Sequence, residues 1–189
     1  MNPSAILVTG FGAFEAVTEN PSGALARSLD AREDVRGIEL PVSFRQAPER
    51  IAAALDGWTP LAVLSLGVHP GPEFRLERRA RAALDPERVD NEGTVGSSLG
   101  WQGPDLETSL DLEALRDVLR EGDAPEPSIS EDAGRYVCEC VYRKGLEEGQ
   151  RLGIPALFLH VPPLEHMGLE RQEPVLQRLV DALLLQLEG

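Results

Sequence analysis

Segments with strand-like and helix-like patterns alternate along the whole chain, and this alternation constrains the fold more than any other feature of the sequence. Strand patterns occupy residues 5–9, 37–41, 61–67, 127–130 and 155–161, with a strand or extended arm at 74–80. Three of these patterns are the apolar runs AILVT, LAVLSLG and PALFLHV, and the continuous run LAVLSLG is typical of a central strand covered on both faces of a sheet. Such strands need helices on both sides of them.

Helical patterns lie between most of these strands. We expect the first helix to have Asn20 as its N-cap and Pro21 in its first position. Further helical patterns lie at 51–55, 112–119, 134–149 and 175–187, and a loop rich in Gly, Ser, Asp and Asn is expected at 85–105. This order predicts an α/β fold: a single three-layer α/β/α sandwich over residues 1–189, with a central sheet that is mainly parallel or mixed.

Charge and composition exclude several classes of protein. The net charge of −14 at pH 7 argues against nucleic-acid partners and against anionic membranes, because phosphate groups repel an acidic surface. No apolar run approaches the ~18 residues of a membrane-spanning helix. The chain has two cysteines and no secretory signal pattern, which predicts a cytoplasmic protein without a disulfide framework. The cysteines and histidines lack metal-ligand spacing, so we expect no metal and no cofactor.

The carboxyl ends of the strands are the expected place for a ligand in a fold of this kind. Gly10 and Gly12 follow the first strand, but Glu15 replaces the third glycine of the dinucleotide-binding motif G-x-G-x-x-G, and no P-loop lysine is present. The same turn carries Phe11 and Phe14. These two aromatic side chains either fill space between the loop and the sheet or line a pocket.

Three residues at these strand ends are candidates for nucleophilic catalysis. Cys138 falls near the start of a predicted helix, where the helix dipole favours a thiolate, although a buried structural cysteine has the same pattern. Cys140 faces another side of that helix and is expected to be structural. His160 leaves a strand at its carboxyl end and is either a base or a buried, satisfied histidine. Glu77 either is a solvated charge between arginines or orients the His160 ring.

The chain resembles the pyroglutamyl peptidase I family of cysteine peptidases. The resemblance covers most of the chain and depends on seven short motifs in a specific order. They read T-G-F-x-x-F…N-P-S, L-P-V-x-F, L-G-x-x-P-G, L-E-R, D-N-E-G, S-x-x-A-G-x-Y-x-C and H-V-P, at residues 9–22, 40–44, 66–71, 76–78, 90–93, 130–138 and 160–162. The implied activity is hydrolysis of the amide bond after an N-terminal pyroglutamyl residue, without a metal or cofactor.

The resemblance also assigns roles to individual residues. It implies a catalytic triad of Glu77, Cys138 and His160, which acts through a thioacyl-enzyme. By the same resemblance, substrate-binding residues that surround the pyrrolidone ring are Phe11, Phe14, Asn20, Tyr136 and Val137. Partners are expected to be N-terminally pyroglutamylated peptides, and assembly into homodimers or homotetramers is implied.

Five positions depart from the family pattern or replace one of its residues. Glu139 follows the nucleophile where the family has asparagine, Ala82 stands in place of another asparagine, and Val68 in place of a glutamine. Glu87 occupies the usual place of an arginine before D-N-E-G, and Arg88, next to it, is the candidate for oxyanion support. Two alternatives therefore stay open: a non-catalytic or retuned relative that binds pyroglutamyl peptides, and a nucleoside phosphorylase or nucleosidase on a similar fold.

Overall fold

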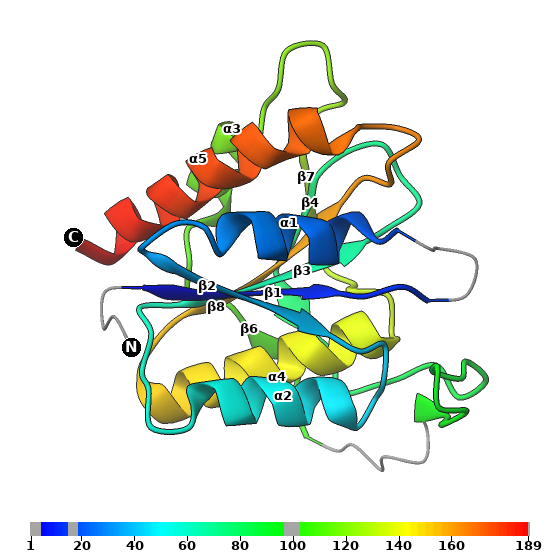
Figure 1. Ribbon diagram of the computed structural model, residues 1–189. Helices are drawn as coiled ribbons and strands as arrows, with labels where there is room; N and C mark the ends of the chain where they lie inside the picture. The colour runs from blue at the N-terminus through cyan, green and yellow to red at the C-terminus, as the bar shows by residue number, and fades with distance from the viewer. Residues whose placement is uncertain (1–4, 15–18, 97–102, 189) are drawn as a thin grey trace.

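The computed structural model describes residues 5–14, 19–96 and 103–188 (Figure 1). Glu15 and residues 97–102 of the expected loop lie outside the described residues. The strands are β1 (Ile6–Phe11), β2 (Val35–Leu40), β3 (Val63–Val68), β4 (Arg75–Glu77), β5 (Arg79–Ala80), β6 (Leu106–Glu107), β7 (Ser128–Ser130) and β8 (Ala156–Val161). The helices are α1 (Pro21–Leu29), α2 (Gln46–Leu55), α3 (Leu112–Val118), α4 (Val137–Leu152) and α5 (Leu169–Glu188).

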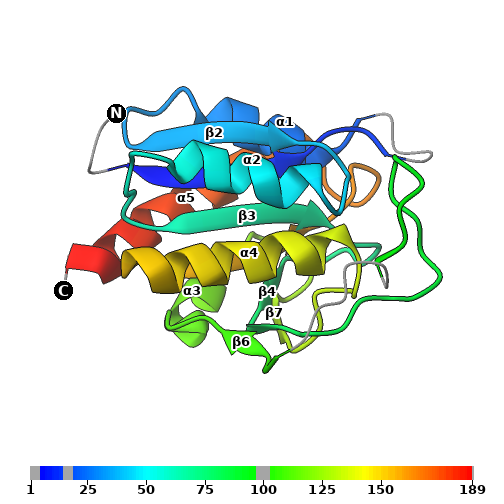
Figure 2. The same cartoon turned by 90° about the horizontal axis from the view of Figure 1, so that it is seen from below.

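Six of the strands form one sheet in the order β2-β1-β3-β8-β4-β7. Neighbouring strands are parallel except that β4 runs antiparallel to β8. Helices α1, α3 and α5 lie on one face of this sheet and α2 and α4 on the other, as Figures 1 and 2 show together. The predicted α/β sandwich with a mainly parallel, mixed sheet is confirmed.

The two apolar cores follow from the alternation of side chains along each strand. In β1, Ile6 and Val8 join the core under α1, α3 and α5, whereas Leu7 joins the core under α2 and α4. All three side chains are fully buried. The apolar run of β1 therefore contributes to both faces of the sheet.

The predicted arm at 74–80 is divided between two sheets. The Arg78 amide donates to the Ser130 carbonyl at 2.8 Å, while the Arg78 carbonyl accepts from the Thr108 amide at 3.1 Å. The chain therefore leaves the main sheet at Arg78 and continues as β5, which pairs with β6. Strand β6, of two residues, has no pattern of its own in the sequence.

Two helix starts show how local chemistry determines an element's boundary. Asn20 caps α1 as predicted, because its Oδ1 accepts a hydrogen bond from the Ser22 amide at 3.1 Å. Helix α4 begins at Val137, three residues after the predicted start at Gly134. Gly134 and Arg135 have φ angles of 93° and 55°, which no helix accommodates, so the chain turns through this loop before the helix begins.

None of the helices in the described part of the chain combines the length and the apolar character that crossing a membrane requires.

The close approach of β1 to α1 requires a glycine at position 10. A methyl group there would lie 2.0 Å from the Ser22 carbonyl oxygen. Gly10→Ala is expected to lower the free energy of unfolding in urea by about 1–3 kcal/mol, the usual cost of overpacking. Gly145→Ala is the control, because a methyl group in that helix would make ordinary 3.7 Å contacts with Ala156 and Val63. The control should be neutral or stabilising by up to ~1 kcal/mol, and equal stabilities for both variants would contradict the close approach.

Candidate active site

A cavity of about 510 Å³ opens at the carboxyl ends of β1, β3 and β8. Its lining includes eight of the nine residues predicted for the site, namely Phe11, Phe14, Asn20, Arg88, Tyr136, Val137, Cys138 and His160. Glu77, the ninth, is fully buried beside the cavity and contacts His160. Residues from distant parts of the chain therefore meet where the sheet topology predicts a ligand site.

His160 and Glu77 form a hydrogen-bonded pair across neighbouring strands. The His160 Nδ1 and Glu77 Oε1 atoms are 2.7 Å apart, and both side chains are buried. Glu77 pairs in register with Phe158, so His160 is its diagonal neighbour on the same face of the sheet. With Nδ1 held by the carboxylate, the Nε2 atom of the ring is the one available for proton transfer.

The second oxygen of Glu77 has no hydrogen-bond partner within the described residues. The Tyr142 hydroxyl donates instead to the Glu77 backbone carbonyl at 2.8 Å. A buried carboxylate with so few donors is stabilised chiefly by a positive charge nearby. The carboxylate is therefore placed to hold the His160 ring and to face any positive charge that forms on it.

Cys138 is the second residue of α4 and is half-buried in the wall of the cavity. Tyr136, the N-cap residue, has an extended backbone and makes no side-chain capping bond. Because the first amides of a helix have no acceptor within the helix, those at the start of α4 are suited to hold an anion beside the thiol. Cys140 is buried, and its thiol donates to the Phe44 carbonyl at 3.4 Å.

The environment of Cys138 favours the neutral thiol. Burial and the nearby Glu77 carboxylate raise the pKa of Cys138 to about 12, against a smaller lowering by Arg88. The position of Cys138 at the start of a helix was expected to favour a thiolate. The effects of burial and of the Glu77 carboxylate are larger, and they favour the thiol. Proton transfer to a base is therefore needed to activate the sulfur.

Gly67 allows the thiol to approach the strand that carries the histidine. Gly67 pairs in register with His160, in adjacent strands. A methyl group on Gly67 would lie 3.0 Å from Sγ of Cys138 and 2.8 Å from the Phe158 ring. The sulfur thus packs directly over the backbone of β3, next to the His160 strand.

His69 also lines the cavity, and the sequence analysis gave it no role. Its Nε2 lies 2.7 Å from the Glu73 carbonyl, and its Nδ1 accepts from the Gly71 amide at 3.1 Å. Burial lowers its pKa, so the ring is neutral. Both nitrogens are occupied by its own turn, and the His69 ring packs edge-on to His160 with centroids 5.8 Å apart. The position of His69 after the central strand was the only signal in the sequence.

The predicted ring-binding residues form the other end of the cavity. Phe11 is almost fully buried and Phe14 half-buried, so Phe11 belongs to both the core and the lining. Asn20 uses its polar atoms within the loop: Oδ1 accepts from Ser22, and Nδ2 donates to the Gly12 carbonyl at 3.1 Å. Asn20 therefore holds the shape of this turn.

Arg88 reaches the cavity, and Glu87 is not among the lining residues. The guanidinium carbon of Arg88 lies 3.8 Å from the centroid of the Tyr136 ring. The Tyr136 hydroxyl donates to the Val89 carbonyl at 2.8 Å, which fixes the ring. Arg88 stacks on this ring and so places a positive charge in the cavity. The charge comes from position 88, one residue after the position at which the family has its arginine.

The other departures from the family pattern have different surroundings. Val68 lines the cavity. The Ala82 amide donates to Asp105 at 3.1 Å. The Glu139 side chain is fully buried, and burial raises its pKa to about 7. No group of three or more His, Cys, Asp and Glu side chains within the described residues is arranged to hold a metal ion.

The comparisons with known proteins agree with these observations. The sequence model described as pyroglutamyl peptidase matches residues 4–185. A pyrrolidone-carboxylate peptidase of Pseudomonas fluorescens is 30% identical over 189 residues, which cover 94% of this chain and 88% of that protein. One from Saccharolobus islandicus is 28% identical, with 95% and 89% covered.

Solved structures give the same result. The pyrrolidone carboxyl peptidase from Thermococcus litoralis superposes with a TM-score of 0.85 at 25% identity, covering 97% of this chain and 94% of that one. The enzyme from Pyrococcus furiosus superposes with a TM-score of 0.86 at 26% identity, covering 97% and 99%. On the extent of the sequence match and of the shared fold, the chain belongs to the pyroglutamyl peptidase family.

Proposed function

We propose that this chain is a cysteine exopeptidase that hydrolyses the amide bond after an N-terminal pyroglutamyl residue. The observation that carries the proposal is the buried pair of Glu77 and His160 beside the cavity that Cys138 lines. The family and the names of its relatives, pyrrolidone-carboxylate peptidases, support the substrate class. The phosphorylase alternative has no support from these matches.

The chemistry of the substrate fits an apolar cavity. Pyroglutamate is a neutral lactam, so its recognition requires ring shape, apolar walls and a few hydrogen bonds rather than a charged partner. We assign the ring to the end of the cavity formed by Phe11, Phe14, Tyr136 and Val137. Asn20 supports this end by holding the turn after β1.

Catalysis proceeds by acyl transfer in two stages. His160 Nε2 takes the thiol proton as the Cys138 sulfur attacks the scissile carbonyl carbon. The carbonyl oxygen becomes an oxyanion, which the amides at the start of α4 stabilise with help from the Arg88 charge; one such donor is typically worth ~2.7–4 kcal/mol. His160 then gives its proton to the leaving amine, and the C–N bond breaks to leave a thioester.

Hydrolysis completes the cycle with the same groups. Water gives a proton to His160 and adds to the thioester carbonyl. The C–S bond then breaks, the sulfur recovers the proton from His160, and free pyroglutamate leaves. Throughout, the Glu77 carboxylate keeps the His160 ring in position and stabilises its protonated form.

Further features of the protein remain proposals. We assign all 189 residues to one domain, in agreement with the family match over residues 4–185. Assembly into homodimers or homotetramers is proposed from the family resemblance. A cytoplasmic location is proposed from the two free cysteines, and nucleic-acid and membrane partners are not expected for a chain with a net charge of −14.

Replacing the nucleophile tests the proposal directly. Cys138→Ala should lower the hydrolysis of a fluorogenic pyroglutamyl amide by on the order of 10³-fold or more, because the acyl acceptor is lost. Cys140→Ala, two residues away and buried, is the matched control and should keep turnover. A prolyl amide, whose ring carries a charged amine, should not be cleaved. Wild-type protein that binds the pyroglutamyl amide without releasing amine would favour the non-catalytic alternative.

Replacing the carboxylate tests the role of Glu77. Glu77→Gln keeps the shape and an acceptor for Nδ1 but removes the charge that stabilises the imidazolium. The kcat for the same amide should fall about 10²–10⁴-fold, with a smaller change in KM. Glu107→Gln, on the exposed strand β6, is the control. Unchanged kcat in Glu77→Gln would show that the charge has no part in the reaction.

A further inference from the structure

Glu139 is a buried carboxylate immediately after the nucleophile, and the reaction described above does not use it. Its side chain has no exposed surface. It forms no ion pair with any Lys, Arg or His side chain among residues 5–14, 19–96 and 103–188. A buried charge of this kind is costly unless its oxygens are occupied by donors, so its hydrogen bonds indicate what it does.

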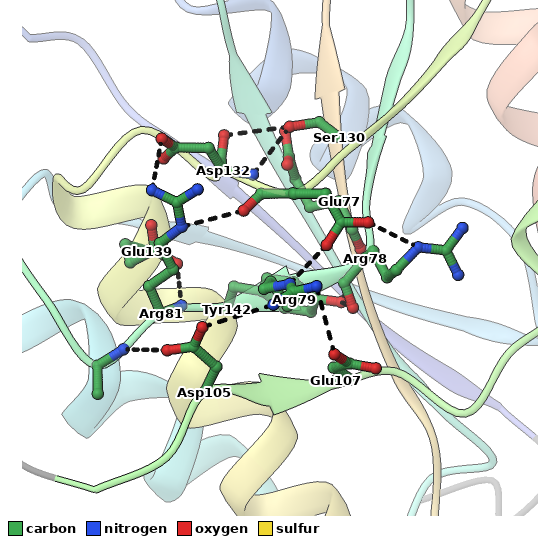
Figure 3. Close-up of polar contacts among 12 residues, drawn as sticks. Glu77, Arg78, Arg79, Arg81, Asp105, Glu107, Ser130, Asp132, Glu139 and Tyr142 are labelled. Carbon is green, nitrogen blue, oxygen red and sulfur yellow. Dashed lines mark hydrogen bonds and ion pairs between the residues drawn. The ribbon is translucent and has the colours of Figure 1, made fainter.

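Each oxygen of Glu139 accepts one backbone hydrogen bond, and the two donors come from different parts of the chain. Oε1 accepts from the Arg81 amide, just after β5, at 2.6 Å. Oε2 accepts from the Arg135 amide, in the loop before α4, at 3.2 Å. Figure 3 shows Glu139 beside Arg81 and the loop that carries Asp132. The Glu139 side chain, on α4, therefore connects the segment at Arg81 with the loop at Arg135, two segments that are far apart in the sequence.

The loop that Glu139 holds forms part of the cavity wall and turns into the helix of the nucleophile. Arg135 adopts a left-handed conformation with φ of 55°, which residues other than glycine disfavour. Its amide is held by Glu139 and its carbonyl accepts from Asp85 at 2.8 Å. Gly134, also left-handed, donates to Asp132 Oδ1 at 3.0 Å. The strained turn thus depends on two groups outside itself: Glu139 as an acceptor and the Asp85 amide as a donor.

We infer that Glu139 is a positioning residue, whose ionised carboxylate fixes the loop at 130–136 so that the amides at the start of α4 face the oxyanion. The inference rests on the proposed function. A carboxylate accepts at both oxygens, whereas a protonated carboxyl gives up acceptor capacity at one of them. Protonation of Glu139 would weaken its hydrogen bond to the Arg81 amide or to the Arg135 amide. The loop would then lose one of the two contacts through which Glu139 holds it.

The groups around Glu139 place the protonation of its carboxylate in the neutral pH range. Burial is the main cause that raises its pKa to about 7, and the negative charges of Asp132 and Glu77 raise it further, against the two backbone donors. The guanidinium of Arg81, whose amide donates to Glu139, is itself held by Asp132 at 3.0 Å and by the Glu131 carbonyl. Of the neighbouring ionisable groups on α4, Cys138, Cys140 and Tyr142 all have raised pKa values, so they are neutral at this pH. The Arg143 guanidinium, one helical turn further on, pairs with Glu147 at 3.1 Å and donates to the Pro104 carbonyl at 3.0 Å.

The inference predicts a specific pH profile. Glu139→Gln has one acceptor oxygen at every pH, so it should behave like the protonated wild type. At pH 8 its kcat for the pyroglutamyl amide should be at least ~10-fold lower, a partial loss of the ~10²–10³-fold that one oxyanion donor contributes, with KM changed much less. As pH falls from 8 to 6 the wild type loses the same interaction, so the ratio of the two kcat values should approach one. Glu147→Gln, exposed on the same helix, should follow the wild type throughout.

Two further measurements separate positioning from a general loss of structure. Alkylation of Cys138 by iodoacetamide needs the thiol but no oxyanion site, so Glu139→Gln should be alkylated at least as fast as wild type. In hydrogen exchange at pH 8, peptides covering 131–138 should exchange faster in Glu139→Gln than in wild type, and peptides of β1 should not. Glu139→Asp keeps the charge and should restore part of the kcat at pH 8.

The outcomes are distinguishable. An active wild type whose kcat profile and loop exchange are unchanged in Glu139→Gln would overturn the inference about Glu139. Faster exchange across the whole chain, rather than in the 131–138 peptides alone, would assign Glu139 to folding alone, which also overturns it. If Glu139→Gln does not fold, wild-type exchange in the 131–138 peptides, corrected for intrinsic rates, should rise as pH falls below 7, and a flat profile would contradict the inference. A wild type without turnover would overturn the proposed function instead.

Discussion

The hydrogen bond between Glu77 and His160 is the interaction on which the site depends most. It places a carboxylate and an imidazole together in the sheet with almost no access to water, where an unpaired charge is costly. The carboxylate raises the pKa of the Cys138 thiol. In the proposed reaction, the same carboxylate faces an imidazolium once the proton moves to His160, and stabilises it. The arrangement therefore favours the charge distribution of the reaction over that of the resting site.

The mixed topology of the sheet makes this pair possible. If β4 were parallel to β8, its carboxyl end would lie at the same edge of the sheet as the carboxyl ends of β1, β3 and β8, where the cavity opens. Because β4 instead runs antiparallel to β8, Arg75 lies beside His160, and Glu77 lies one pair deeper, opposite Phe158. The carboxylate is thus placed behind the histidine ring and away from the cavity. Cys138, the proposed nucleophile, approaches from the other side, where Gly67 leaves room for the sulfur.

The layers and most elements could be predicted from the sequence. The spacing of apolar residues indicates the type of each element, and capping residues mark where a helix begins, and both signals lie within the element itself. The Asn20 cap is one example: an acceptor side chain and a following proline suffice. The division of the 74–80 arm at Arg78 was not predicted, since it depends on partners at Ser130 and Thr108 that are distant in sequence. For the same reason, the late start of α4 was missed, because its turn is held by Glu139 and Asp85. The positions of Cys138, His160 and Glu77 made them candidates, and family motifs assigned their roles, whereas neither the fixed His69 ring nor the contacts of Glu139 leave a sequence pattern.

The central claim is that Cys138 carries the acyl group of the substrate. The most direct test is to mix the protein with a pyroglutamyl aryl ester, for which thioester hydrolysis is the slower stage, quench with acid and locate the adduct by peptide mass spectrometry. The account predicts a pyroglutamoyl group on Cys138, formed and lost at rates consistent with turnover. Ester hydrolysis that proceeds with no acyl group on Cys138, or with the group on another residue, would contradict it.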